Sequence, residues 1–392
     1  MRNTDLPEDG IADMNLLYDA FQASMKGSSW KGEPQGFEAD FLSELTKLSD
    51  ELLDKTYRTS KGSEFVLKER GKERYIHGNR MRDRVVRHCI CDNVLTPTLS
   101  KYLIYNNGAS QKGKGIDFSR KIFERDLHNY WLEHRSNEGY IAFMDLSKFF
   151  DNIVHEEALS RIRPKIDEQS QWLIEVIFDN FKVDVSYMSD EEYQSCMKKK
   201  FNSIEYHKNV PEELKTGKKF MRKSVDIGDQ VSQDVGTFFP TDVDNYATIV
   251  RGCRRYGRYM DDIYIIHEDR EFLKSVIAGI EKIADEMGMF LNKKKTRIVK
   301  LSTTYTYLQF KYSLSNTGKV IKRINPKSVT RERRKLKKYK HLLDRGVLSY
   351  PEIEQCYKSW ICDYAKYMSK VQREHMQALY EELFGRRIRW KQ

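Results

Sequence analysis

Two segments in the middle of the chain have the apolar pattern of buried strands. Residues 139–145 (GYIAFMD) are apolar on both alternating faces and end in an acid, which predicts a central strand with Asp145 at its end. Residues 258–266 (RYMDDIYII) place β-prone side chains on either side of Asp261 and Asp262, which predicts a hairpin whose tight turn presents two carboxylates.

A different pattern begins near residue 325, where apolar residues recur at helical spacing within a strongly basic run (Val329, Leu336, Leu342 and Leu343). Gly346 breaks this pattern, and a stretch rich in Trp and Tyr follows it. Trp360 and Tyr364 stand at helical spacing and are expected in a core rather than as platforms for stacked bases. This pattern therefore predicts a small helical bundle in the C-terminal part of the chain.

The net charge of +11 is concentrated in this basic run. Residues 321–345 hold eleven Lys and Arg against two acids, so most of the excess positive charge of the 392-residue chain lies there. A solvated helix face normally mixes both signs, and this one does not. The pattern favours a helix laid along a phosphate backbone, and hence contact with nucleic acid.

Composition excludes several other classes of protein. With 39% hydrophobic and 12% aromatic residues, the chain can bury a large core and is expected to form two or three domains. Its apolar runs are too short to cross a bilayer, and the first ten residues (MRNTDLPEDG) lack the apolar region of a secretory signal. The six cysteines form no CxxC pair, which fits free thiols in a reducing cytoplasm. We therefore expect a cytoplasmic protein with no membrane partner.

The acids at the strand ends carry the predicted chemistry. Carboxylates at the edge of a core are costly unless a cation compensates their charge. Asp145, Asp261 and Asp262 would form an all-oxygen site for Mg²⁺, with Mn²⁺ as an alternative ion. Two such ions about 3.5–4 Å apart activate a hydroxyl and stabilise a leaving pyrophosphate, which is polymerase chemistry. Asp145 and Asp261 would be the shared ligands and Asp262 an occasional one.

These motifs resemble the reverse transcriptase family. Tyr259-Met-Asp-Asp262 resembles its catalytic hairpin, and Asp145-Leu-Ser-Lys-Phe-Phe150-Asp-Asn-Ile153 resembles the strand and turn that carry the other metal ligand. The resemblance implies an α+β, right-hand polymerase fold, with fingers at 1–138, an antiparallel-sheet palm at 139–324 and a basic helical thumb at 325–392. It also implies dNTPs, a template RNA and a primer or DNA product as partners.

Further blocks match the family in the same order. Gly228-Asp-Gln-Val-Ser-Gln233 resembles the helix-opening segment beneath the incoming nucleotide, which makes Ile227, Gly228 and Gln233 candidate nucleotide contacts. Gly288 to Thr296 resembles the block after the hairpin, in which Lys295 would approach the departing pyrophosphate as a candidate general acid. Tyr305 to Phe310 resembles the hairpin that grips the primer end.

In the N-terminal third, Lys72-Glu-Arg74-Tyr-Ile76 resembles a basic strand that reaches the nucleotide triphosphate, so Lys72 and Arg74 are candidate contacts. Arg74 could equally be an ordinary surface residue of a strand. Gln111-Lys-Gly-Lys-Gly115 could hold phosphate through backbone N–H groups and side chains, or be a flexible loop.

The residue five positions after Asp145 predicts the sugar of the product. In polymerases with this palm, a bulky aromatic side chain there occupies the place of a ribose 2′-OH, whereas enzymes that make RNA have an acid or a small polar residue. Phe150 stands at this position, and Asp151 comes one residue too late. We therefore expect DNA as the product.

Other features concern the type of reverse transcriptase. Ile227 stands where many bacterial relatives have glutamine, and Ser232-Gln233 replaces Ser-Pro, which resembles the enzymes of diversity-generating retroelements. We hypothesise that the loss of a polar contact beneath the base pair reduces the fidelity of copying, as in those enzymes, which make frequent errors at template adenines. Stand-alone bacterial enzymes of antiphage defence, which make templated or self-primed DNA, share the same core and remain an alternative.

Two other classes of function explain the sequence less well. A non-catalytic RNA-binding protein on this fold does not explain three intact acids, and a structural hub explains the charge but not the acids. Residues 186–224 match no block of the family, and their mixed charge predicts a surface insertion that contacts the template or a partner. An accessory protein or an oligomer is therefore among the expected partners.

Overall fold

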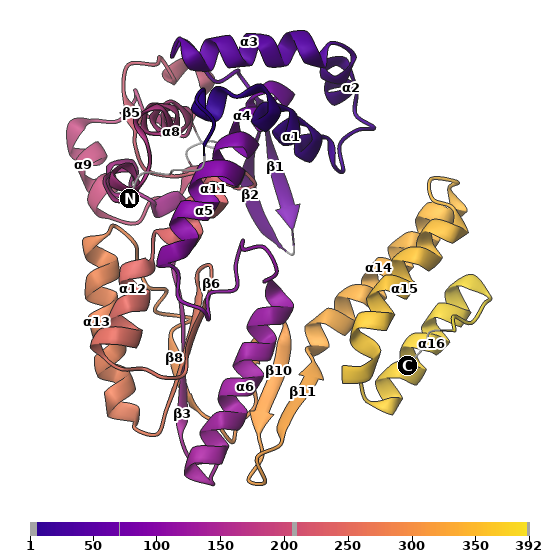
Figure 1. The fold of residues 1–392 in the computed structure, drawn as a ribbon. Coiled ribbons are helices and arrows are strands. Elements are labelled where there is room, and N and C mark those ends of the chain that lie inside the picture. Colours follow the sequence, from indigo (N-terminus) through magenta and orange to yellow (C-terminus); the bar gives the residue numbers. More distant parts are fainter. Residues whose placement is uncertain (1–5, 70, 206–209, 390–392) are drawn as a thin grey trace. The chain divides into compact units, whose positions relative to one another are not determined.

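The structure is a computed structural model, and it describes residues 6–69, 71–205 and 210–389. Its helices and strands combine into an α+β fold with antiparallel pairings (Figure 1). Up to residue 198 the elements are η1 (Gly10–Ala12), α1 (Met14–Met25), α2 (Gly32–Ala39), α3 (Phe41–Leu53), β1 (Ser63–Glu69), β2 (Lys72–Gly78), α4 (Met81–Ile90), η2 (Cys91–Leu95), α5 (Thr96–Leu99), η3 (Ser100–Tyr102), α6 (Ile116–His134), β3 (Tyr140–Asp145), η4 (Phe150–Asn152), α7 (His155–Ile162), η5 (Arg163–Lys165), α8 (Glu168–Asn180), β4 (Val183–Asp184) and α9 (Asp190–Lys198).

The elements after residue 210 are η6 (Glu212–Leu214), β5 (Phe220–Met221), α11 (Gln230–Phe238), α12 (Thr241–Asn245), η7 (Tyr246–Val250), β6 (Tyr256–Tyr259), β7 (Asp262–His267), α13 (Arg270–Glu286), β8 (Arg297–Lys300), β9 (Tyr305–Tyr307), β10 (Phe310–Leu314), β11 (Val320–Ile324), α14 (Pro326–Asp344), α15 (Tyr350–Tyr364), η8 (Ala365–Tyr367) and α16 (Lys370–Phe384).

A four-stranded sheet in the order β6-β7-β3-β8 lies at the centre of the site region. Strand β3 is buried from Ile141 to Asp145 and has a neighbour on each side, which confirms the predicted central strand. Strands β6 and β7 pair antiparallel with Tyr259 opposite Asp262, which confirms the predicted hairpin. Helix α13 packs on β7 and lies beside α12 (Figure 1). Asp145 thus lies at the end of β3, and Asp261 and Asp262 lie at the turn between β6 and β7.

Contacts divide the chain into two compact units. The first comprises residues 1–119 and 142–298, and the second comprises residues 120–141 and 299–392. The first unit therefore holds the helices α1 to α5, the hairpin β1–β2 and nearly all of the four-stranded sheet. The boundaries of these units differ from those of the predicted fingers, palm and thumb, and that division stays a prediction.

In the second unit, helix α6 packs on the sheet β11-β10-β9 through aromatic rings. The ring centroid of Phe123 lies 4.4 Å from that of Tyr307 and 5.1 Å from that of Tyr312. Strands β9 and β10 form an antiparallel hairpin whose turn holds Leu308 and Gln309 at φ 39° and 75°. The predicted hairpin at residues 305–310 is thus confirmed.

Helices α14, α15 and α16 form the predicted C-terminal bundle (Figure 1). Leu336 and Tyr357 are fully buried in it, and Tyr357 stacks on Tyr380 with ring centroids 4.7 Å apart. Trp360 and Tyr364 are partly buried against this core, as expected from their spacing. The basic side chains of α14 remain on the outside because the apolar positions face the other two helices.

The segment 186–224, predicted to be a surface insertion, has a small core of its own. Val185, Phe201 and Met221 are buried together between β4, α9 and β5. The side chain of Asn152 fixes this segment, since its Nδ2 donates to the Phe201 carbonyl (3.2 Å) and its Oδ1 accepts from the Phe201 N–H (2.8 Å). Residues 206–209 of the segment lie outside the described residues.

Within the part of the chain that the structure describes, no helix is both long and apolar enough to cross a membrane.

The bundle core yields a stability prediction. Replacing Leu336 with Ala removes a fully buried side chain, so the free energy of unfolding should fall by about 2–5 kcal/mol. Replacing its exposed neighbour Lys337 with Ala should change the free energy by less than about 0.5 kcal/mol. Chemical denaturation of both full-length variants checks this, and equal effects would contradict the assigned core.

Candidate active site

Backbone hydrogen bonds bring the ends of β3 and of the β6–β7 hairpin together. The Leu146 N–H donates to the Asp261 carbonyl at 3.2 Å, and the Asn292 N–H donates to the Asp145 carbonyl at 2.7 Å. The hairpin turns at Met260, whose φ of 54° lies in the left-handed region. The turn and the strand end therefore present Asp145, Asp261 and Asp262 to one another.

Burial and neighbouring negative charge raise the pKa of Asp261 and of Asp262. Burial, followed by the charge of Asp145, raises the pKa of Asp261 above its ordinary value. Asp262 is exposed on its strand, but the protein around its carboxyl group, followed by the charges of Asp261 and Asp145, raises its pKa to about 7. Like charges in one place oppose ionisation, and a nearby cation relieves this cost.

Lys295 supplies one such cation. Its Nζ pairs with Asp145 Oδ1, and Asn292 Nδ2 donates to Asp145 Oδ2 at 3.2 Å. Burial would lower the pKa of Lys295, but the hydrogen bond and charge of Asp145 raise it above its ordinary value. The structure thus brings Lys295 into the site as the partner of Asp145, and its role as a general acid stays a prediction.

Strand β2 carries the candidate nucleotide contacts of the N-terminal third. The positive charge of Lys72 opposes part of the rise in the pKa of Asp261 and of Asp262. The structure therefore places Lys72 within electrostatic reach of these acids. Arg74 pairs with Glu69 across the β1–β2 hairpin at 3.8 Å and keeps a half-exposed side chain. The structure therefore connects Lys72 to the acids, while the ion pair it shows for Arg74 lies within the hairpin.

Phe150 lies between the strand end and the helix α11. Its ring meets that of Phe149 edge-on with centroids 5.4 Å apart, and its carbonyl accepts from the Val225 N–H at 3.0 Å. Gly236 of α11 faces both rings, and a Cβ there would lie 3.3 Å from each of them. Because glycine has no side chain, the two rings can pack against the backbone of α11 at Gly236.

The block that opens α11 follows directly. Ile227 is partly buried, Gly228 has φ 97°, and Gln233 Oε1 accepts from Ser110 Oγ at 3.3 Å. The neighbouring acids tie this block to β2 and to the residue after it. Asp226 Oδ2 lies 2.8 Å from His77 Nδ1, and Asp229 Oδ2 accepts from Asn79 Nδ2 at 2.7 Å. The predicted helix opening is confirmed, with Asp229 as the residue that caps it.

Contacts with the residues on either side of it hold the loop at residues 111–115. Lys114 Nζ donates to the carbonyls of Tyr105 (2.9 Å) and Asn107 (3.2 Å), and it lies over the rings of Tyr105 and Phe118. Burial lowers the pKa of Lys114. These contacts hold the loop in place and leave its proposed phosphate contact a prediction.

The donor set fits a hard divalent cation, because Asp145, Asp261 and Asp262 offer only oxygen ligands and repel one another. Among the described residues, no group of three or more His, Cys, Asp or Glu side chains is already arranged to hold a metal ion. The fit therefore rests on the chemistry and mutual repulsion of the acids, and Lys295 holds one oxygen of Asp145.

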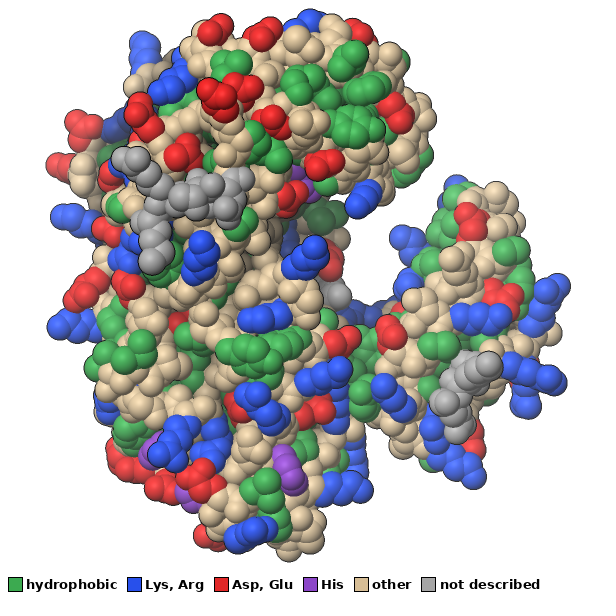
Figure 2. Space-filling view, viewed as in Figure 1, with side chains coloured by type: hydrophobic (Ala, Val, Ile, Leu, Met, Phe, Trp, Pro, Cys, Tyr) green, Lys and Arg blue, Asp and Glu red, His purple; other side chains and the backbone are tan. Residues whose placement is uncertain are grey.

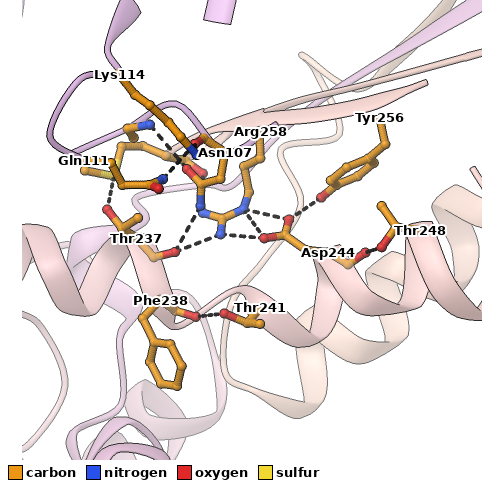
Figure 3. Close-up of polar contacts among 12 residues, drawn as sticks. Asn107, Gln111, Lys114, Thr237, Phe238, Thr241, Asp244, Thr248, Tyr256 and Arg258 are labelled. Atoms are coloured by element: carbon orange, nitrogen blue, oxygen red, sulfur yellow. Dashed lines mark hydrogen bonds and ion pairs between the residues drawn. The ribbon is translucent and has the colours of Figure 1, made fainter. Parts of the chain in front are cut away.

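Sequence reasoning missed the ion pair behind the hairpin. Arg258 and Asp244 are both fully buried, and Arg258 Nη2 lies 2.7 Å from Asp244 Oδ2 (Figure 3). Arg258 stands at the start of the β-prone segment 258–266, but two further arginines precede it closely, so the sequence does not single it out. Nothing in the sequence around Asp244 identifies it as the partner.

The basic face predicted from the sequence is carried by α14. Several of its side chains are exposed (Arg331, Arg333, Arg334, Lys337 and Lys338). Figure 2 shows Lys and Arg side chains over the bundle that α14 forms with α15 and α16. Such a concentration of positive charge is typical of surfaces that bind nucleic acid.

Comparison with known proteins gave one family. Residues 66–312 match the family model described as reverse transcriptase (RNA-dependent DNA polymerase). The match spans more than half of the chain and includes all ten candidate site residues from Lys72 to Lys295. No curated protein matches the chain.

The raised pKa of Asp262 predicts how stability depends on pH. The pKa of Asp262 rises from 3.8 to about 7 on folding, so the folded state holds this proton more tightly than the unfolded chain does. The resulting stabilisation of the folded state is fully present below about pH 4 and is lost as the pH rises through 7. Without divalent ions, wild type should therefore lose more thermal stability between pH 5 and pH 8 than Asp262→Asn does.

Magnesium should offset this loss, raising the melting temperature more at pH 8 than at pH 5 because protons and the ion compete for the carboxylates. The magnesium effect should shrink in Asp261→Asn. An equal magnesium effect in wild type and Asp261→Asn would contradict a metal site at these acids.

Proposed function

The chain belongs to the reverse transcriptase family and is an RNA-directed DNA polymerase, and we propose that it adds dNTPs to a primer 3′ end by two-metal nucleotidyl transfer. The observation that carries this proposal is the meeting of Asp145, Asp261 and Asp262 at the strand ends, where burial and neighbouring negative charge raise the pKa of Asp261 and of Asp262. Asp145 and Asp261 would hold two Mg²⁺ ions, with Asp262 as an occasional ligand and Mn²⁺ as an alternative ion. Bound ions would supply activation of the primer hydroxyl and neutralisation of the phosphate charge.

Residues of the chain would then position the nucleotide. Lys72 brings positive charge to the side of the acids, where a triphosphate would bind, and Arg74 extends this charge along β2. Lys295, which neutralises Asp145 here, would turn to the departing pyrophosphate as a general acid. Gly228 and Gln233 would contact the nucleotide from the start of α11.

The sugar would be selected by Phe150. Its ring is backed by Phe149 and by the bare backbone of Gly236, so it has little room to retreat. A ribose 2′-OH would meet the ring, whereas a deoxyribose would not. The backbone bond from Val225 to the Phe150 carbonyl connects this gate to Ile227 and Gly228.

The template RNA and the growing DNA would be held partly by the basic face of α14. Its exposed Lys and Arg side chains suit phosphate contacts that position a duplex without reading its sequence. The segment 186–224 offers a surface for the template or for an accessory protein.

We further propose that the enzyme serves a bacterial retroelement of the diversity-generating type in the cytoplasm. Ile227 is partly buried, and at the position that the family resemblance assigns to the segment beneath the incoming nucleotide it would bring no polar group to the base pair. Errors at template adenines in the products would support this role, and their absence would favour antiphage defence.

Primer extension tests the activity. Wild type should extend a DNA primer on a defined RNA template with Mg²⁺ and dNTPs, and Asp261→Asn should lose at least about 100-fold in rate, because it removes a metal ligand. Asp19→Asn, the same change at an exposed acid of α1, is the matched control and should keep the rate. Undiminished extension by Asp261→Asn would remove the proposed metal ligand, and template binding without extension by wild type would favour a non-catalytic RNA-binding role.

The sugar gate has its own test. Phe150→Ala should raise incorporation of ribonucleotides relative to deoxyribonucleotides by about 10- to 100-fold, because the side chain that meets the 2′-OH is gone. The measurement is the ratio of kcat/KM for dGTP and GTP in single-nucleotide extension. An unchanged ratio with intact dGTP incorporation would show that Phe150 is not the gate.

A further inference from the structure

The strand that leads into the catalytic turn contains a fully buried arginine. Arg258 lies on β6 between Tyr256 and Tyr259, and its guanidinium meets the equally buried Asp244 of α12 (Figure 3). Nε donates to both Asp244 oxygens at 2.8 and 3.0 Å, and Nη2 donates to Oδ2 at 2.7 Å. Two charges without solvent are tolerated because these bonds satisfy them together.

The remaining donors of Arg258 point to backbone carbonyls. Nη2 also donates to the Thr237 carbonyl near the end of α11 at 2.8 Å, and Nη1 donates to the Met260 carbonyl at 3.3 Å. Met260 is the residue with φ 54° in the turn that presents Asp261 and Asp262. One guanidinium therefore joins α11, α12 and the turn that carries the acids.

The loop before α6 holds the same strand from its edge. The Arg258 N–H donates to the Asn106 carbonyl at 3.4 Å, and the Arg258 carbonyl accepts from the Gly108 N–H at 3.3 Å. Asn107 Nδ2 donates to the Thr237 carbonyl at 3.4 Å (Figure 3). The position of Arg258 is thus determined by both its backbone and its side chain.

The tie to the turn is specific to Arg258. A left-handed residue such as Met260 is strained unless its surroundings hold it, and a charged donor on its own carbonyl is such a restraint. Tyr256 belongs to the same network, since its hydroxyl donates to Asp244 Oδ1 at 2.6 Å. Tyr256 bonds Asp244 and shows no hydrogen bond to the turn, so it is a matched comparison within one network.

We propose that Arg258 is a positioning residue for the reaction: it fixes the Met260 carbonyl and so the orientation of Asp261 and Asp262 toward the metal ions. This inference rests on the proposed two-metal function. The effect passes through the backbone, because the charges that most strongly shift the pKa of Asp261 come from Asp145, Lys295 and Lys72.

The test compares Arg258→Lys with Tyr256→Phe in the full chain. Lysine keeps the charge opposite Asp244 but cannot bond Asp244, Thr237 and Met260 at once. We expect Arg258→Lys to lower kcat by at least about tenfold, to leave KM for dNTP within about twofold, and to need more Mg²⁺ for half-maximal rate. Tyr256→Phe should lower the melting temperature yet keep kcat and the magnesium requirement.

A second readout does not depend on turnover. The rise in melting temperature caused by Mg²⁺ should be smaller in Arg258→Lys than in wild type and unchanged in Tyr256→Phe. If Arg258→Lys does not fold, Asp244→Asn, which keeps the size of the side chain and removes its charge, carries the same comparison and should show the same changes.

Two outcomes are decisive. The proposal is overturned if Arg258→Lys and Tyr256→Phe both lose activity in proportion to their loss of stability and both keep the magnesium requirement of wild type. The ion pair of Arg258 and Asp244 would then have a structural role alone. If wild type itself makes no DNA, the proposed function fails, and the magnesium effect on the melting temperatures then decides alone whether Arg258 orients the acids.

Discussion

The repulsion among three carboxylates is the constraint on which the site depends. Asp145, Asp261 and Asp262 are brought together at the ends of β3 and of the β6–β7 hairpin, where burial makes each charge expensive. Lys295 and Lys72 supply the positive charge that partly offsets this cost. A fold that gathers like charges must also hold them by their backbone, and the hydrogen bonds of Leu146, Asn292 and Arg258 do this. These bonds therefore keep an electrostatically unfavourable arrangement in place.

The sequence was informative where short-range patterns decide the structure. The apolar run before Asp145 and the β-prone residues around Asp261 and Asp262 predicted a central strand and a hairpin, and both are present. The basic helix and its aromatic partners were also predictable, because helical spacing separates Leu336 from the charged face. Such features depend on the residue and its near neighbours, so one chain suffices to infer them.

Long-range partners could not be inferred in this way. Asp244 lies 14 residues before Arg258, and only the packing of α12 behind β6 joins them. The pairing of Lys295 with Asp145 bridges 150 residues and gives the lysine a place that a motif alone does not specify. The small core around Phe201 was missed because its apolar residues are scattered through a polar segment. In each case the missing information is the identity of the neighbour.

The division of the chain into units has a consequence for how it reaches this structure. The chain leaves the first unit at residue 119, returns at 142 and leaves again at 298, so neither unit is continuous in sequence. During synthesis, Phe123 must wait for Tyr305 to Tyr312 before its helix has a sheet to cover, and β3 must wait for β7 and β8. Contacts between such distant segments slow folding and leave apolar surface exposed meanwhile. A fragment cut at any of these three boundaries would separate segments that pack together, so the polymerase is expected to fold only when nearly the whole chain is available.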